Sequence, residues 1–285
     1  MTPEEAAAKA WTWRLDDGTA SNDWDRYHER LLAVASRRGL RVEDLGPPGH
    51  LPLPLLTNDP RVTAAPRILI GSGFHGEEAA GPWGVLAFLE SVEDWLLAGV
   101  GLTVLPLVNV SGFREGRRFN DLGENPNRGY LPGAEASSRE GRILLSHGDR
   151  LRDSARDGLL ACHEDVLLSH CYVYGMERSG APGEFSRGLL RANASFFAVH
   201  PDGEVDGCPV RDGIVFNHQD TSFESWLLLA GACRAACVET PGQQPIERRI
   251  AAQVAMMRFF VEHSTEDQKG DSPSSCTVEK GTARS

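Results

Sequence analysis

The sequence predicts an α/β fold in which a central, mostly parallel sheet is flanked by helices. Apolar runs typical of buried strands alternate along the chain with segments of helical periodicity. Four of these runs end in clusters of polar residues, as expected where parallel strands open onto a ligand site. The 285 residues and a hydrophobic fraction of 41% allow one sizeable core, so we expect one compact domain.

The first part of the chain predicts two helices and two strands. Residues 23–38 have apolar side chains at helical spacing, and a Pro-rich connection that cannot be helical follows them. Residues 67–73 (RILIGSG) have the composition of a buried strand. Residues 81–99 indicate a helix, with Pro82 near its first turn and a glycine near its end. Residues 101–110 indicate the second strand.

The rest of the chain continues the alternation after a long polar loop. We expect a helix at 139–153 and a third strand at 158–165 (GLLACHED). An irregular, glycine-rich region follows. The remaining expected elements are a helix at 222–232, a fourth strand at 234–242 and a last helix that begins at Pro245. The catalytic domain is expected to span residues 1–263, and the polar tail at 264–285 is expected to be disordered.

Composition and charge exclude several classes of function. The net charge is −11, which argues against nucleic acid as a partner. The first residues, MTPEEAAAKAWTW, lack the basic and apolar regions of a signal peptide, and no stretch has the length of a membrane span. We therefore expect a soluble, cytoplasmic protein without a membrane partner. The six cysteines form no CxxC pair, so buried free thiols are expected rather than a zinc ribbon.

Reactive side chains lie at the ends of the predicted strands. His75 and Glu78 follow the first strand in the sequence GFHGEE, and His163 ends the third in CHED. Two histidines and one glutamate form a ligand set of catalytic zinc, which keeps a position open for water. The combination predicts a site for one zinc ion, although an isolated HxxE pair would carry little weight.

Hydrolysis at such a site needs a base, a cation for the developing oxyanion and a group that holds the substrate. Glu239, at the end of the fourth strand, is a candidate base, or it caps the following helix. Arg117 and Arg118 are candidates for the cation, or they are solvated loop residues. Asn127 and Arg128 are candidates for gripping a carboxylate, because a guanidinium offers two parallel hydrogen bonds.

The order of these motifs resembles that of the M14 zinc carboxypeptidases and of the related succinylglutamate desuccinylase and aspartoacylase group. HxxE is followed by Asn-x-x-Gly, Arg-x-Asn-x-x-Gly-x-x-x-Asn-Arg, a distant His and a strand that ends in Glu-Thr-Pro. The resemblance covers roughly Arg67 to Phe260. It implies a zinc carboxypeptidase-like fold of the phosphorylase/hydrolase type, with a mixed, mostly parallel sheet of about eight strands between helices.

The resemblance also implies a role for each matching residue. It assigns the zinc ligands as His75, Glu78 and His163. Arg118 would polarise the scissile carbonyl, and Glu239 would be the general base. The pair that binds the terminal carboxylate of the substrate would be Asn127 and Arg128.

Two departures from the family pattern bear on this assignment. The slot that normally holds an aspartate behind the first histidine ligand is Asn125, a neutral acceptor that would make His75 less basic. The mobile tyrosine before the catalytic glutamate is also missing, because all four tyrosines precede Gly175. This second departure weakens the expectation of peptidase-style capping of a C-terminal residue.

The function expected from the sequence is that of a zinc-dependent metallocarboxypeptidase-like hydrolase, which cleaves an amide bond next to a free carboxylate through zinc-bound water. The substrate would be a small peptide or an N-acyl amino acid. Alternatives are a deacylase of small N-acyl amino acids, a murein-peptide amidase and a non-catalytic binding module. His218 is the reserve third ligand, and Glu224 is either a pocket residue or a first-turn charge. The oligomeric state is left open.

Overall fold

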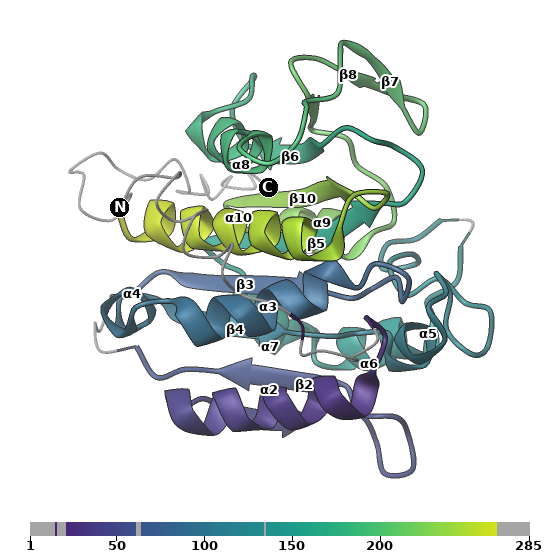
Figure 1. Ribbon diagram of the computed structural model, residues 1–285, viewed down its shortest axis with the longest axis vertical. Coiled ribbons are helices and arrows are strands. Elements are labelled where there is room, and N and C mark those ends of the chain that lie inside the picture. Colours follow the sequence, from purple (N-terminus) through teal and green to yellow (C-terminus); the bar gives the residue numbers. More distant parts are fainter. Residues whose placement is uncertain (1–14, 16–20, 61–63, 134, 267–285) are drawn as a thin grey trace, which may run out of the picture.

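The computed structural model describes residues 15, 21–60, 64–133 and 135–266, and its centre is an eight-stranded sheet (Figure 1). In spatial order the strands are β1 (Arg41–Asp44), β2 (Pro54–Thr57), β4 (Gly101–Leu105), β3 (Arg67–Ser72), β5 (Gly158–Asp165), β10 (Arg234–Pro241), β6 (Tyr172–Glu177) and β9 (Ile214–Phe216). The pairs β4–β3, β3–β5, β5–β10 and β6–β9 are parallel, and the other three are antiparallel. The predicted mixed, mostly parallel sheet is confirmed.

Helices cover both faces of this sheet. The helices packed on one face are α2 (Trp24–Arg38), α3 (Ala80–Ser91), α8 (Glu184–Ala194) and α10 (Ile246–Glu266). Figure 1 shows α2, α3 and α10 crossing the near face of the sheet. The helices packed on the other face are α6 (Arg139–Ser146), α7 (Gly148–Ser154) and α9 (Phe223–Leu229). Two short helices, α4 (Asp94–Ala98) and α5 (Val110–Glu115), flank β4 in the chain, and β7 (Gly203–Val205) and β8 (Cys208–Val210) form a separate hairpin.

Side chains of the central strands alternate between two apolar cores. In β3, Ile68 and Ile70 pack into the core under α3 and α10, whereas Leu69 packs into the core under α7 and α9. Strand β5 does the same with Leu160 and Leu159. This period-two alternation between two apolar layers explains why the central strands are continuous apolar runs in the sequence.

The prediction of one helix over residues 81–99 is wrong, because the structure has α3 and α4 with a break between them. Val92 has an extended backbone, with φ −65° and ψ 144°. The guanidinium of Arg38, from α2, donates hydrogen bonds to the carbonyl oxygens of Leu89, Glu90 and Val92. The last carbonyls of α3 are therefore satisfied by a distant side chain, which local sequence does not reveal.

The segments expected to be irregular also contain elements. The Pro-rich connection holds β2, and the glycine-rich region after β5 holds β6, α8, the β7–β8 hairpin and β9. The helix predicted over residues 139–153 is two helices, α6 and α7, which meet at His147. That break lets both Leu144 and Leu151 reach the same core.

The C-terminal tail and the cysteines differ in part from the predictions. Helix α10 continues to Glu266, three residues into the expected tail, and residues 267–285 lie outside the described residues. Four cysteines are free and buried as expected: Cys162, Cys171, Cys208 and Cys237. Cys233 departs from the expectation because it is disulfide-bonded. Within the described ranges, no helix combines the length and apolar character that a membrane span requires.

Candidate metal centre

The loop after β3 is shaped by two glycines. Gly73 has φ 64°, and a Cβ there would lie 2.3 Å from Cδ1 of Leu107. Gly76 packs backbone to backbone against α5, since a Cβ on it would lie 2.0 Å from the carbonyl carbon of Gly112. Only glycine fits these positions. The close packing holds the following residues at the carboxyl edge of the sheet.

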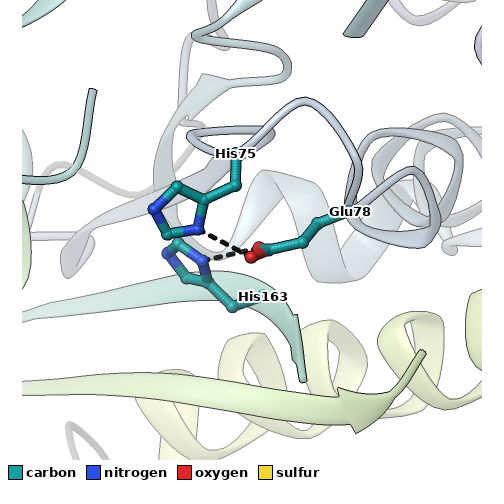
Figure 2. Close-up of side chains that lie close together, drawn as sticks. All are labelled: His75, Glu78 and His163. Atoms are coloured by element: carbon teal, nitrogen blue, oxygen red, sulfur yellow. Dashed lines mark hydrogen bonds and ion pairs between the residues drawn. The ribbon is translucent and has the colours of Figure 1, made fainter. Parts of the chain in front are cut away.

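The structure brings His75, Glu78 and His163 together. Nδ1 of His75 lies 2.6 Å from Oε1 of Glu78, and Nδ1 of His163 lies 2.7 Å from Oε2 of the same carboxylate. Figure 2 shows both imidazole rings directed at this carboxylate. The three residues are only 3%, 2% and 2% exposed, in that order. Buried polar groups this close act as one unit.

The charges in this cluster are strongly linked. Burial alone would raise the pKa of Glu78, but His75 and His163 lower it well below its usual range. Burial would lower the pKa of His163, yet Glu78 and Glu224 raise it well above its usual range. For His75 burial prevails, and its pKa is lowered. The charge states of the carboxylate and the two histidines therefore depend on one another.

The chemistry of this donor set fits a zinc ion. The candidate ligand atoms of His75, Glu78 and His163 all lie within 4.8 Å of one another. Two imidazole nitrogens and a carboxylate are a common protein ligand set of catalytic zinc. The Nδ1 atoms of both histidines already converge on the Glu78 carboxylate, and a dication bound between these groups would displace protons from them.

The far nitrogens of both histidines contact oxygen acceptors. Nε2 of His75 lies 3.2 Å from Oδ1 of Asn125, the contact expected from the family position. Nε2 of His163 lies 3.4 Å from Oε1 of Glu224, which is 1% exposed. Such acceptors fix the ring orientation and raise the basicity of the ligand nitrogen. Glu224 thus lies against the cluster, which its position at a helix start did not distinguish from that of a first-turn charge.

The candidate base lies beside the third candidate ligand because of strand register. Glu239 in β10 pairs directly with His163 in the parallel strand β5. Burial raises the pKa of the Glu239 carboxyl to about 8, with His163 opposing and Glu78 adding to the effect. The thiol of Cys237 lies on the same side of the strand and donates to Oε1 of Glu239 at 3.4 Å.

Arg118 lies next to the cluster and is partly exposed. Its carbonyl oxygen accepts from the Gly76 backbone N–H at 3.4 Å and from the Asn109 side-chain amide at 3.1 Å. Its Nη1 lies 3.5 Å from Oε1 of Glu78 and 3.6 Å from Oε1 of Glu77. The backbone is therefore tethered while the guanidinium can reach a substrate oxygen. Arg117, the other candidate, pairs instead with Glu115 at 3.0 Å.

The two residues predicted to hold a carboxylate have different surroundings. Asn127 is 4% exposed, and its Oδ1 accepts from the backbone N–H of Phe223 at 3.1 Å. Its Nδ2 lies 3.2 Å from Oε2 of Glu224. Arg128 is less buried, and its Nη2 lies 3.2 Å from Oδ2 of Asp220. The Asn127 amide is thus committed to protein groups, whereas Arg128 faces the cavity beside an acidic partner.

One cavity of about 240 Å³ joins these groups. It is lined by His75, Arg118, Asn127, Arg128, His163, Tyr174, Met176, Asp206, Cys208, His218, Asp220, Ser222, Glu224, Cys237 and Glu239. His218 contributes to the wall and contacts Cys208 at 3.3 Å, but it is not part of the histidine–glutamate cluster. Tyr174 supplies a phenol from β6, a strand absent from the sequence-based elements.

We expect Gly76→Ala to disrupt this site. The new Cβ would overlap the backbone of Gly112 and push the loop outward, and a shift of about 1 Å in a catalytic group can cost about a hundredfold in rate. Zinc affinity and turnover should both fall. Gly180→Ala is the matched control, because a Cβ there meets nothing within 4 Å. Equal zinc titration curves for the two variants would show that the close packing does not position the ligands.

Asn125→Asp is expected to tighten zinc binding. A His75 that binds metal through Nδ1 carries its proton on Nε2 and donates it to Asn125, and a carboxylate there would make the imidazole a stronger ligand. We expect about a tenfold gain in zinc affinity, and about a tenfold loss for Asn125→Ala. Competition with a chromogenic chelator measures both. An unchanged affinity in the aspartate variant would mean that this contact does not tune the ligand.

Comparisons with known proteins identify relatives that match most of the chain. A candidate metallopeptidase from Shewanella amazonensis is 49% identical, with 88% of this chain and 97% of that chain covered and a TM-score of 0.84. Another, from Shewanella denitrificans, is 46% identical over 89% and 95% of the two chains, with a TM-score of 0.83. A metallo-carboxypeptidase from Burkholderia cenocepacia shares the fold at 20% identity, over 87% and 70%, with a TM-score of 0.64.

The family model of the succinylglutamate desuccinylase/aspartoacylase catalytic domain matches residues 64–162, a range that includes His75 and Glu78 and ends one residue before His163. None of the curated proteins matches the sequence. The Shewanella relatives and the carboxypeptidase-like fold agree with the motifs in the sequence. The chain therefore belongs to the M14-like metallopeptidases, a family of hydrolases to which the succinylglutamate desuccinylase and aspartoacylase group is related.

Proposed function

We propose that the chain is a zinc-dependent metallocarboxypeptidase-like hydrolase that cleaves an amide bond next to a free carboxylate. The observation that carries the proposal is the placement of Glu239 directly beside His163, with Arg118 and Arg128 in the wall of the same cavity. Base, oxyanion cation and carboxylate partner thus surround the buried histidine–glutamate cluster, in the arrangement that amide hydrolysis requires.

His75, Glu78 and His163 would hold the zinc ion. When bound there, zinc would act as a Lewis acid toward the carbonyl and lower the pKa of a water molecule. Asn125 and Glu224 keep the two rings oriented. The burial of the cluster excludes bulk water and strengthens each of these electrostatic interactions.

The chain's own side chains would carry the proton and the developing charge. Glu239 takes a proton from the attacking water and returns it to the leaving amine. Its raised pKa makes it a stronger base than an exposed glutamate, and a nearby dication would bring that pKa down from about 8. Arg118 stabilises the negative charge that develops on the carbonyl oxygen. Arg128 holds the substrate carboxylate.

The second candidate is a deacylase that acts on small N-acyl amino acids. The match to the desuccinylase/aspartoacylase domain favours it. A murein-peptide amidase would use the same side chains on a larger substrate, a murein-derived peptide. A non-catalytic binding module would hydrolyse none of these substrates.

A hydrolysis screen on the zinc-loaded protein tests the proposal. The panel consists of C-terminal dipeptides, N-acyl amino acids and murein-derived peptides, each paired with a control in which the free carboxylate is amidated. We expect hydrolysis in one class and a loss of about tenfold or more on amidation, because the charge-assisted contact to Arg128 is removed. Turnover that is indifferent to amidation would refute the carboxylate requirement, and no turnover in any class would favour the binding module.

A further inference from the structure

Arg128 is flanked by acidic side chains that amide hydrolysis does not use. Asp220 lies beside Arg128, with Oδ2 3.2 Å from Nη2, and Glu135 lies 3.7 Å from Nε of the same guanidinium. Nη1 donates to the backbone carbonyl of Asn127 at 2.8 Å. The cation that would grip a substrate carboxylate is therefore already paired with carboxylates of the protein.

Asp220 is held firmly in this position. Its Oδ1 accepts from the backbone N–H of Ser222 at 2.9 Å and from the hydroxyl of Ser225 at 3.0 Å. Burial would raise its pKa, but the hydrogen bonds from Ser222 and the charge of Arg128 lower it. These contacts occupy Oδ1, and Oδ2 faces the guanidinium of Arg128. Asp220 is thus an ionised and oriented part of the wall.

A second carboxylate, Asp206, is supplied by the β7–β8 hairpin. Val205 pairs with Cys208 across a two-residue turn, and both turn residues, Asp206 and Gly207, have positive φ, 51° and 76°. Oδ2 of Asp206 accepts from the hydroxyl of Tyr174 at 3.4 Å. In the described part of the chain no cation forms an ion pair with Asp206, although it lines the cavity.

A bare carboxylate fits this wall poorly. It would gain Arg128 but would be brought next to Asp220, so like charges would offset much of the attraction. A group that carries an ammonium beside its carboxylate has no such conflict. The carboxylate meets Arg128, and the ammonium meets Asp220, with Asp206 as a further acceptor. The juxtaposed cation and anion of the wall are complementary to the two charges of a free amino-acid end.

We propose that the substrate presents a zwitterionic amino-acid end, with α-ammonium and α-carboxylate on one carbon, to the Arg128–Asp220 pair. This inference rests on the proposed function and names its substrate class. Because the α-amine is then free, the amide that is cut lies on a more distant amine of the same molecule. The substrate is an amide of the side-chain amine of a diamino acid, and the free carboxylate that Arg128 holds lies at the far end of that diamino acid, separated from the scissile bond by the side chain.

Binding to the zinc-loaded protein tests the inference without turnover. The probes are norleucine, which has the zwitterionic end, and hexanoate, which has the same chain and the carboxylate alone. We expect norleucine to bind about tenfold or more tighter, as removal of one charge-assisted contact predicts. Asp220→Asn should abolish that preference and Asp206→Asn should reduce it. If the amine of norleucine bound the zinc ion instead, the preference for norleucine over hexanoate would not depend on Asp220.

Asp202→Asn is the matched control. Asp202 is an exposed aspartate near the same hairpin; it pairs with Arg211 and does not line the cavity. Hexanoate binding as tightly as norleucine, with Asp220→Asn tightening both, would overturn the inference and leave amide hydrolysis intact. If norleucine bound more tightly than hexanoate, this preference depended on Asp220 and the chain hydrolysed no amide, the zwitterion-binding site would stand and the proposed function would be refuted.

A kinetic comparison then tests which amine is acylated. Nε-acetyl-lysine keeps the zwitterionic end free, whereas Nα-acetyl-lysine has a carboxylate and a distant ammonium. We expect kcat/KM to be about tenfold or more higher for Nε-acetyl-lysine in the wild type, and the difference to collapse in Asp220→Asn, mainly through KM. A preference for Nα-acetyl-lysine would contradict the inference even if the binding preference for norleucine were observed.

Discussion

Glu239→Gln should leave zinc binding unchanged and lower kcat by about a hundredfold to ten-thousandfold, the contribution typical of a general base. Glutamine keeps the shape and the hydrogen bond from Cys237 but cannot accept the proton of the attacking water. Steady-state kinetics on a substrate from the screen, with zinc content measured in parallel, checks this. Glu43→Gln, on the exposed edge strand β1, is the matched control. Wild-type turnover in Glu239→Gln would remove Glu239 from the chemistry.

The same variant gives a pH-dependent stability test on the zinc-free protein. The folded-state pKa of Glu239 is raised to about 8, so between its ordinary value and about 8 the folded chain holds a proton that the unfolded chain has released. The free energy of unfolding of the wild type therefore falls with rising pH through this window, by at most about 1.4 kcal/mol per pH unit from this group. Glu239→Gln should lack this slope in urea titrations. If the free energy of unfolding had the same pH dependence in the wild type and in Glu239→Gln, the Glu239 carboxyl would be more solvated than its raised pKa implies.

His163→Ala should weaken zinc binding by more than about a hundredfold, since loss of a ligand exceeds the cost of losing an outer contact. Activity should fall to background. The zinc-free variant should also lose about 3–5 kcal/mol of stability, because Glu78 and Glu224 would remain buried without the cation they share. Zinc titration and urea unfolding measure the two effects.

His218→Ala is the control for that experiment. His218 lines the same cavity and contacts Cys208, but it is not part of the cluster with His75 and Glu78. It should retain zinc and fold normally. If His218→Ala lost zinc and His163→Ala kept it, the third ligand would be His218, and the proposed position of the ion in the cavity would have to move.

Local patterns predicted the parts of the site that lie close in sequence or at strand ends. The spacing of His75 and Glu78 is short, and the GFHGEE and CHED clusters end neighbouring parallel strands, so adjacency in the sheet brings them together. The contact between Asn125 and His75 also followed from its motif position. The convergence of the two clusters needed only the order and direction of the strands, whereas the Asn125 contact rested on the resemblance to the family.

Contacts between distant segments were not predictable in this way. Glu224 faces Asn127, 97 residues earlier, and only the packing of α9 against the sheet reveals it. The pairing of Arg128 with Asp220 spans a similar separation. In the fold, the break after α3 depends on Arg38, more than fifty residues away in sequence from the Glu90 carbonyl it binds. A single sequence contains no local signal of such tertiary partners.

Zinc content of the purified chain tests the central claim most directly. We expect about one zinc ion per chain in the wild type and in Glu239→Gln, and close to none in His163→Ala, when each is dialysed against the same low zinc concentration. Elemental analysis normalised to protein concentration measures it. A wild-type chain that holds no zinc, and gains none when zinc is added, would contradict the claim that these side chains form a zinc site.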